Sequence, residues 1–210
     1  MNAAVILIIF ILCIVGTYLY QRWAQKQFLQ KLYEIRKTGK PEEYLAALDS
    51  RYAKLNLSDG ARLQMKVNYC IQNDREEDVQ KLADSMDGMK ISLNEKAEIL
   101  FQIFGYYVQK DNSKECGRYK TMLDQILEHP ETQEQELIKG ETEQMYRVFI
   151  QKDVNMIPDL EETLADIQNP EVKMVICTRL AYLYRQLGLN EKAESYEAQG
   201  KGFAKEARND

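Results

Sequence analysis

The sequence predicts an all-α protein with an N-terminal transmembrane helix, followed by an α-solenoid of about five antiparallel helix pairs. Three observations lead to this prediction. The first residues form a long apolar run without a charge, no alternation typical of a strand follows it, and turn signals recur every 35 to 41 residues.

Residues 3–20 carry no charged side chain. At about 1.5 Å of rise per residue they would span about 27 Å, close to the thickness of the hydrocarbon core of a bilayer. A cleaved signal peptide and a lipoprotein signal at Cys13 are the alternatives, but the basic start and the small residues that such signals need are missing. The sequence therefore predicts a permanent transmembrane helix over residues 1–20.

The flanks of this run predict its orientation. Residues 21–40 hold six basic side chains and one acid, Glu34, whereas no basic side chain precedes the run. By the positive-inside bias, the N-terminus lies outside and the C-terminal part lies in the cytoplasm. We therefore expect a single-pass protein of the cell membrane with a cytoplasmic domain. Since no Pro or Gly interrupts residues 21–37, the basic juxtamembrane segment 21–40 should continue the helix into the first repeat.

Residues 41–210 form the predicted helical-repeat domain. They carry 22 basic and 32 acidic side chains, a formal charge of −10. This balance argues against nucleic acid as a ligand, because phosphate binding needs a basic patch. Cys70, Cys116 and Cys177 are odd in number and widely spaced, which favours reduced thiols over disulfides.

Gly, Pro, Asn and Asp signals divide this part of the chain into short helices. The predicted helices are residues 21–37, 41–56, 59–73, 75–87, 92–110, 113–128, 131–151, 155–167, 170–187 and 190–206. The turns within successive pairs are placed at Gly39, Asp74, Asn112, Asp153 and Gly188, which are 35, 38, 41 and 35 residues apart. Such a period is typical of a helix-pair solenoid, and a non-repeating helical bundle is the alternative.

One stretch, residues 177–200, holds a set of leucine, small and aromatic residues that matches a known helical repeat. These are Leu180, Ala181, Tyr184, Gly188, Ala193 and Tyr196. The stretch resembles a tetratricopeptide repeat, and residues 101–124 resemble it more loosely. Cys177 and Gly200 depart from the family pattern, which favours a bulky aromatic and an alanine there. The resemblance implies a right-handed stack of helix pairs with a concave face, and it implies no chemistry.

No residue pattern predicts catalysis. His129 is the only histidine, no C-x-x-C pair is present, and no phosphate-binding glycine motif occurs. Cys116 near a helix start could be a redox thiol, but it lacks a resolving cysteine and is better explained as a packing residue. Acidic runs at 131–136 and 159–162 lie in first helical turns, where they complement the helix dipole. We therefore expect no enzyme activity, no catalytic residue, no cofactor, no metal and no small-molecule substrate.

The register of the repeat resemblance places eight polar, aromatic and basic side chains toward a concave groove: Gln64, Asn68, Gln102, Tyr106, Arg147, Arg179, Tyr182 and Arg185. Arg and Tyr are enriched among binding anchors. The first functional hypothesis is therefore a membrane-anchored adaptor or scaffold whose groove binds a protein partner. The alternative is a structural or assembly component of a membrane complex, acting through its transmembrane helix or by oligomerisation.

Overall fold

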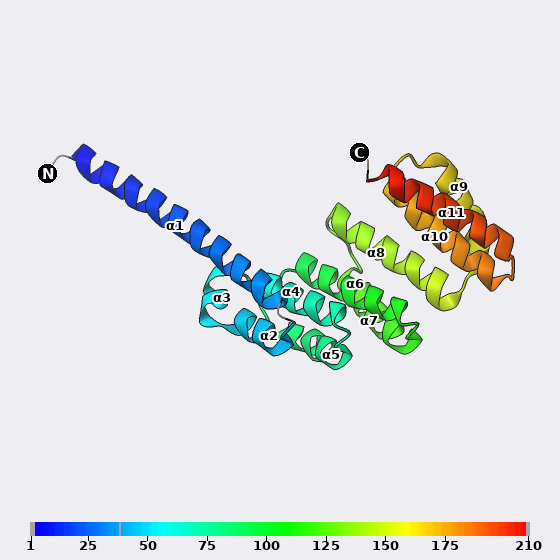
Figure 1. Ribbon diagram of the computed structural model, residues 1–210, viewed down its shortest axis with the longest axis horizontal. Helices are drawn as coiled ribbons and strands as arrows, with labels where there is room; N and C mark the ends of the chain where they lie inside the picture. Colours follow the sequence, from blue (N-terminus) through cyan, green and yellow to red (C-terminus); the bar gives the residue numbers. More distant parts are fainter. Residues whose placement is uncertain (1–2, 38, 209–210) are drawn as a thin grey trace. The chain divides into compact units, whose positions relative to one another are not determined.

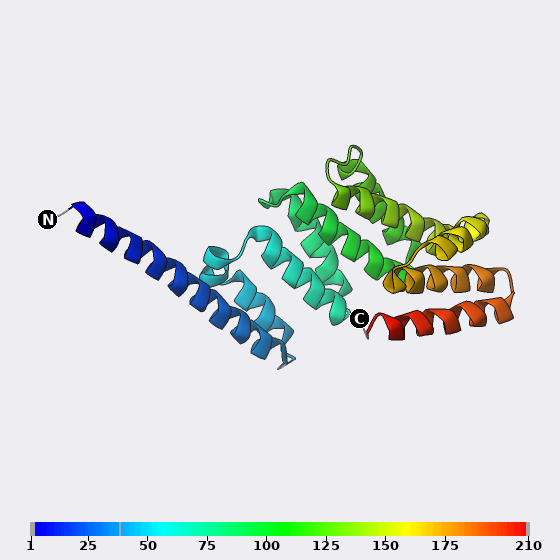
Figure 2. The same cartoon turned by 90° about the horizontal axis from the view of Figure 1, so that it is seen from above.

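The computed structural model describes the backbone of residues 3–37 and 39–208, and the side chains of residues 14–37 and 39–208. Within that part of the chain every regular element is a helix, which confirms the all-α prediction. The chain divides into two compact units, unit 1 (Met1–Ser92) and unit 2 (Leu93–Asp210). Their helices are drawn in two views in Figures 1 and 2.

Unit 1 holds the long N-terminal helix and four shorter ones. Its described elements are α1 (Ala3–Lys37), α2 (Pro41–Asp49), α3 (Arg51–Asn56), α4 (Asp59–Gln72), α5 (Glu76–Asp84) and a 3₁₀ turn, η1 (Ser85–Gly88). Unit 2 holds the C-terminal helices. Its described elements are α6 (Leu93–Gln109), α7 (Ser113–Ile126), α8 (Gln133–Met145), η2 (Tyr146–Gln151), η3 (Val154–Met156), α9 (Ile157–Asp166), α10 (Pro170–Gln186) and α11 (Asn190–Glu206).

The predicted transmembrane helix is not supported. In the described part of the chain, no helix is both long enough and apolar enough to cross a membrane. Of the predicted span, residues 1–13 lie outside the residues whose side chains are described, and residues 14–20 are followed in the same helix by Gln21 and Arg22. The predictions of a single-pass membrane protein and of its cell-membrane location are therefore wrong on this finding. The predicted orientation stays a prediction.

Two predicted helices differ in detail from the observed ones. The predicted helix 41–56 is broken at Ser50, whose hydroxyl donates to the Ala47 carbonyl at 2.7 Å and accepts from the Ala53 amide at 3.2 Å. This side chain caps α3 and lets the chain change direction there. The predicted helix 131–151 begins as α8 but widens into a π-helical segment, η2. Helix α1, by contrast, runs without interruption past residue 20, as expected.

The same turn conformation recurs along the chain. The residues with positive φ among those described are Gly39, Asp74, Asp111, Lys152 and Gly188, which lie 35, 37, 41 and 36 residues apart. Each is followed by a residue with φ between −99° and −72° and ψ between 65° and 94°. Each lies within one residue of a turn predicted from the sequence. A left-handed residue ends one helix, and the next residue starts the helix that runs back.

Three of these turns share one backbone hydrogen bond. The amide of the residue after the left-handed one donates to the carbonyl five positions earlier, at 2.9 to 3.0 Å, in the turns that begin at Asp74, Asp111 and Gly188. This bond satisfies a carbonyl that the helix end would leave unpaired, as in a Schellman motif. The turn is therefore a repeated structural unit and does not depend on one residue type.

An apolar stripe on α1 organises the core of unit 1. Phe28, Leu32 and Ile35 lie about one helical turn apart and share a face of the helix. They belong to one apolar cluster with Tyr44 of α2 and Tyr69 of α4, whose rings stack with centroids 4.4 Å apart. This cluster holds the C-terminal part of α1 against its neighbours.

The α10–α11 hairpin provides much of the core of unit 2. The two helices run antiparallel and side by side in both views of the molecule (Figures 1 and 2). Leu180, Ala181, Tyr184 and Ala193, which carry the repeat resemblance, are all at most 4% exposed. Membership of the tetratricopeptide-repeat family stays a prediction.

We predict opposite effects of one substitution at two glycines. Gly188→Ala should destabilise the protein by about 1 kcal/mol, because its φ of +74° is strained for a residue with a Cβ. Gly202→Ala, inside α11 with nothing within 4 Å of an added Cβ, should stabilise it by about 0.5–1 kcal/mol. The shifts of the urea unfolding midpoints test both. A stabilised Gly188→Ala variant would contradict the turn assignment.

Candidate interaction site

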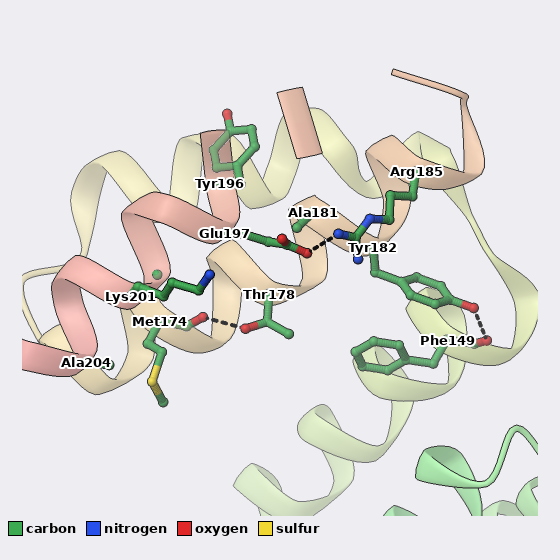
Figure 3. Close-up of a pocket in the computed structure, with 11 residues that line it drawn as sticks. Phe149, Met174, Thr178, Ala181, Tyr182, Arg185, Tyr196, Glu197, Lys201 and Ala204 are labelled. Atoms are coloured by element: carbon green, nitrogen blue, oxygen red, sulfur yellow. Dashed lines mark hydrogen bonds and ion pairs between the residues drawn. The ribbon is translucent and has the colours of Figure 1, made fainter. Parts of the chain in front are cut away.

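A groove lies between α10 and α11 in unit 2 (Figure 3). Its cavity has a volume of about 340 Å³. The residues that line it come from α10, α11 and η2: Phe149, Met174, Thr178, Ala181, Tyr182, Arg185, Tyr196, Glu197, Gly200, Lys201 and Ala204. All its walls therefore belong to one compact unit.

Helical spacing explains why these residues meet. On α10, Met174, Thr178, Ala181 and Arg185 recur every three or four positions and so share one face. The Thr178 hydroxyl donates to the Met174 carbonyl at 2.9 Å, so its hydrogen is directed at the helix backbone. The exposed wall of the groove on this helix is therefore largely apolar.

The two residues that depart from the repeat pattern pack against each other. A Cβ added at Gly200 would lie 3.3 Å from the Cβ of Cys177, which is tighter than ordinary packing. Because both side chains are small, α10 and α11 approach closely below the groove. The combination of a small Cys177 and an absent side chain at Gly200 thus replaces the larger residues that the family pattern favours.

The π-helical segment η2 supplies the end wall. Tyr182 donates from its hydroxyl to the Phe149 carbonyl at 3.2 Å, and the two rings meet edge to face with centroids 5.0 Å apart. Figure 3 shows both rings beside the groove. A π-helical turn displaces side chains from the positions of a regular helix and is often found at functional sites. Here the π-helical segment contains Phe149, whose ring packs against Tyr182 of α10.

Charged side chains form the rim. Arg185 of α10 and Glu197 of α11 meet across the groove in an ion pair of 2.5 Å (Figure 3). Both are partly exposed, so the pair contributes little to stability. Lys201 lies one turn further along α11 and has no ion-pair partner among the described residues. The rim thus offers one unpaired positive charge beside an apolar hollow.

Next to the groove, two tyrosines hold one carboxylate. The hydroxyls of Tyr184 and Tyr196 each donate to Glu161 Oε1 at 2.7 Å, and their rings stack with centroids 5.6 Å apart. These hydrogen bonds, that from Tyr196 first, lower the pKa of Glu161. Burial, together with the hydrogen bond that Tyr184 donates to Glu161, raises the pKa of Tyr184 to about 12. In Figure 3 the Tyr196 hydroxyl points away from the groove.

Two of the predicted arginines are engaged within unit 2. Arg179 is 4% exposed, forms an ion pair with Glu141 and donates a hydrogen bond to Gln144, both of α8. Arg179 therefore joins α8 to α10, and its guanidinium is not available to a partner protein. Arg147 binds Asp153 through Nη2 at 2.6 Å and Nε at 3.1 Å. The hydrogen bond raises the pKa of Arg147 and lowers that of Asp153.

The other predicted groove residues are spread over both units. Tyr106 is 6% exposed and its ring meets that of its neighbour Tyr107 edge-on, so it belongs to the interior of unit 2. Gln102 is half-buried, and its Oε1 has no hydrogen-bond partner among the described residues. Gln64 and Asn68 are half-buried on α4 of unit 1. Of the eight predicted residues, the structure brings Tyr182 and Arg185 into one groove.

The sequence-based reasoning missed several residues that line this groove, among them Phe149, Met174, Glu197 and Lys201. It considered only the first helix of each pair, and Glu197 and Lys201 lie on α11, which is a second helix. Phe149 and Met174 lie on first helices, at positions that the projected register did not select. The helical spacing of Glu197 and Lys201 was the available signal. No local signal pointed to Phe149, because its position depends on the π-helical turn.

Two further predictions from the sequence concern metal ligands and reactive thiols. No group of three or more His, Cys, Asp or Glu side chains in this part of the chain lies close enough together to hold a metal ion. Burial raises the pKa of the Cys70 and Cys116 thiols to about 11. Because the thiolate is the reactive form, a redox role for Cys116 is disfavoured.

Comparisons with known proteins give no relative: no family model, no curated protein and no solved structure matches the chain.

We predict that Tyr196→Phe destabilises the protein by about 1.5–3 kcal/mol near neutral pH, because it removes a hydrogen bond to a carboxylate. A carboxyl whose folded pKa is lowered stabilises the fold above its unfolded pKa of about 4.3, and this stabilisation is lost as the pH falls through the folded pKa. The difference between variant and wild type should therefore shrink below about pH 4. Urea unfolding over a pH series measures it.

Tyr182→Phe is the matched control. It removes a hydroxyl bond to the neutral Phe149 carbonyl, so it should cost only about 0.5–1 kcal/mol and show no such pH dependence. A pH-independent loss in Tyr196→Phe would contradict the role assigned to Glu161.

Proposed function

We propose that the chain is a protein-interaction module that binds a segment of another protein in the groove between α10 and α11. The observation that carries this proposal is a concave, largely apolar surface with a charged rim, built on a rigid helical hairpin. Apolar anchors that enter such hollows supply much of the energy of protein–protein binding. The proposal requires no catalytic step.

The size of the groove favours a side chain over a drug-sized ligand. Ligand pockets have volumes of about 300–1,000 Å³, and the observed 340 Å³ lies at the lower end of this range. A single large apolar side chain of a partner would fill much of it. Aromatic surface from Phe149 and Tyr182 would contact that anchor.

The rim favours an acidic residue beside the anchor. Arg185 is neutralised by Glu197, whereas Lys201 keeps an unpaired charge within the described structure. A carboxylate of the partner next to its apolar anchor would therefore meet Lys201. The preferred partner segment combines one large apolar residue with a nearby Asp or Glu.

We predict that filling the groove abolishes partner binding. Ala204→Leu adds a side chain to the lining of the hollow, so recovery of bound partners should fall at least about tenfold, equivalent to about 1.4 kcal/mol. Ala198→Leu makes the same change at an exposed position of α11 outside the groove and should leave recovery unchanged. Quantitative mass spectrometry of proteins retained by each purified variant measures this.

Equal recovery by both leucine variants would contradict the groove. A change in the sedimentation of purified Ala204→Leu alone would instead point to self-association through this face, which is the assembly alternative.

The charge of the rim gives a second prediction for the same partners. Lys201→Glu should weaken binding several-fold at low salt, since an exposed charge pair contributes about 0.2–1 kcal/mol and reversal adds repulsion. The effect should decrease at high ionic strength. Lys205→Glu, which changes the same charge outside the lining of the groove, is the control. Similar loss in both variants would mean that net charge, and not the rim, governs binding.

A further inference from the structure

Helix α1 carries exposed aromatic side chains beyond the part of unit 1 that covers it. Phe28 and Leu32 are packed in the core of unit 1, whereas Trp23 and Tyr20, about one and two turns before Phe28, are 58% and 67% exposed. In both views α1 extends past α3 toward its N-terminus (Figures 1 and 2). The aromatic rings of Tyr20 and Trp23 therefore lie on a surface of α1 that is open in the described structure.

This part of α1 forms one wall of a groove of about 850 Å³. The other wall comes from the end of α2 and from α3, which Ser50 redirects. The rings of Phe28 and Tyr52 meet with centroids 5.0 Å apart, which closes the floor between the walls. Leu55 of α3 is 75% exposed at its edge.

One cation lines the groove, and three more lie on the two helices that form its walls. Lys31 lines the groove, and Arg22 lines a smaller hollow on the other side of Leu55. Helix α3 adds Arg51 and Lys54 and carries no acid. None of these four cations has an ion-pair partner within the described residues. The groove therefore combines exposed aromatic surface with uncompensated positive charge in a chain whose net charge is −5.

We propose that this groove binds an acidic amphipathic helix of a partner protein. The unpaired cations on α1 and α3 favour a negative partner, and a second copy of α1 would instead bring like charges together. The lining residues of α1 run from position 20 to position 31, which is about 17 Å along the helix. That length suits about three turns of a partner helix with apolar residues at i, i+3 or i+4, and i+7. This surface is independent of the groove in unit 2.

The fluorescence of Trp23 tests the proposal directly, because Trp23 is the only tryptophan of the chain and lines the groove. The probe is a synthetic peptide of about 15 residues with a leucine stripe flanked by glutamates. The matched peptide has lysines in place of the glutamates. We expect the acidic peptide to shift Trp23 emission to shorter wavelength with saturation, and to bind more weakly as salt is added.

Substitutions assign the response to the two features of the groove. Leu55→Ala removes an apolar contact and Lys31→Glu reverses a charge, so each should weaken peptide binding about tenfold. Leu137→Ala, at a leucine 65% exposed in unit 2, and Lys205→Glu are the matched controls and should bind as the wild type does. Unchanged helicity of each variant by circular dichroism excludes unfolding.

Two outcomes would overturn the proposal. Equal responses to the acidic and basic peptides would remove the role of charge. A shift of Trp23 emission with protein concentration alone, together with a dimer in sedimentation, would show that a second copy covers the groove. Neither outcome bears on the groove between α10 and α11.

Discussion

The left-handed residue that ends a helix is the constraint on which the helix pairs depend. An uninterrupted helix would carry its apolar stripe away from the chain that follows, whereas one residue with positive φ lets the next helix run back beside it. Glycine adopts this conformation without strain, and the short polar side chain of aspartate tolerates it. Lys152 is the unusual member, and it follows the π-helical segment, where the Asp153 amide donates to the Arg147 carbonyl at 3.0 Å. The wider helical turn there changes how the chain reverses.

Reversal at Gly188 brings α10 and α11 together, and side-chain size then shapes the surface between them. Cys177 and Gly200 allow close contact at one level, while the alanines at 181 and 204 leave a hollow at another. Stacked Tyr184 and Tyr196 hold Glu161 next to this hollow. The hairpin is thereby stabilised by a satisfied polar cluster, while the hollow beside it remains unfilled by the described side chains.

Residue type alone was a poor guide to which side chains are available for binding. Arg179 was placed toward the groove by the register of the repeat resemblance, and its residue type suggested a binding anchor, yet it joins α10 to Glu141, which lies 38 residues earlier. Arg147 is held by Asp153, and Tyr106 is buried. The apolar run at residues 3–20 was likewise interpreted from its residue types. In the described structure Tyr20, at the end of this run, and Trp23, just beyond it, line a groove beside α3.

The sequence by itself determined that the chain is helical, where most helices begin and end, and where each pair turns. Those features depend on caps, prolines and left-handed residues that act within a few positions of the chain. Only the tertiary structure decided that Ser50 redirects α3, that η2 carries Phe149 to Tyr182, and which arginines are already paired. For Arg179 and Tyr182 the physical reason is distance along the chain: their partners lie 33 to 38 residues away, which no local pattern encodes. The Ser50 cap and the Arg147–Asp153 pair are local, but serine and arginine at these positions are equally compatible with a continuous helix and an exposed side chain.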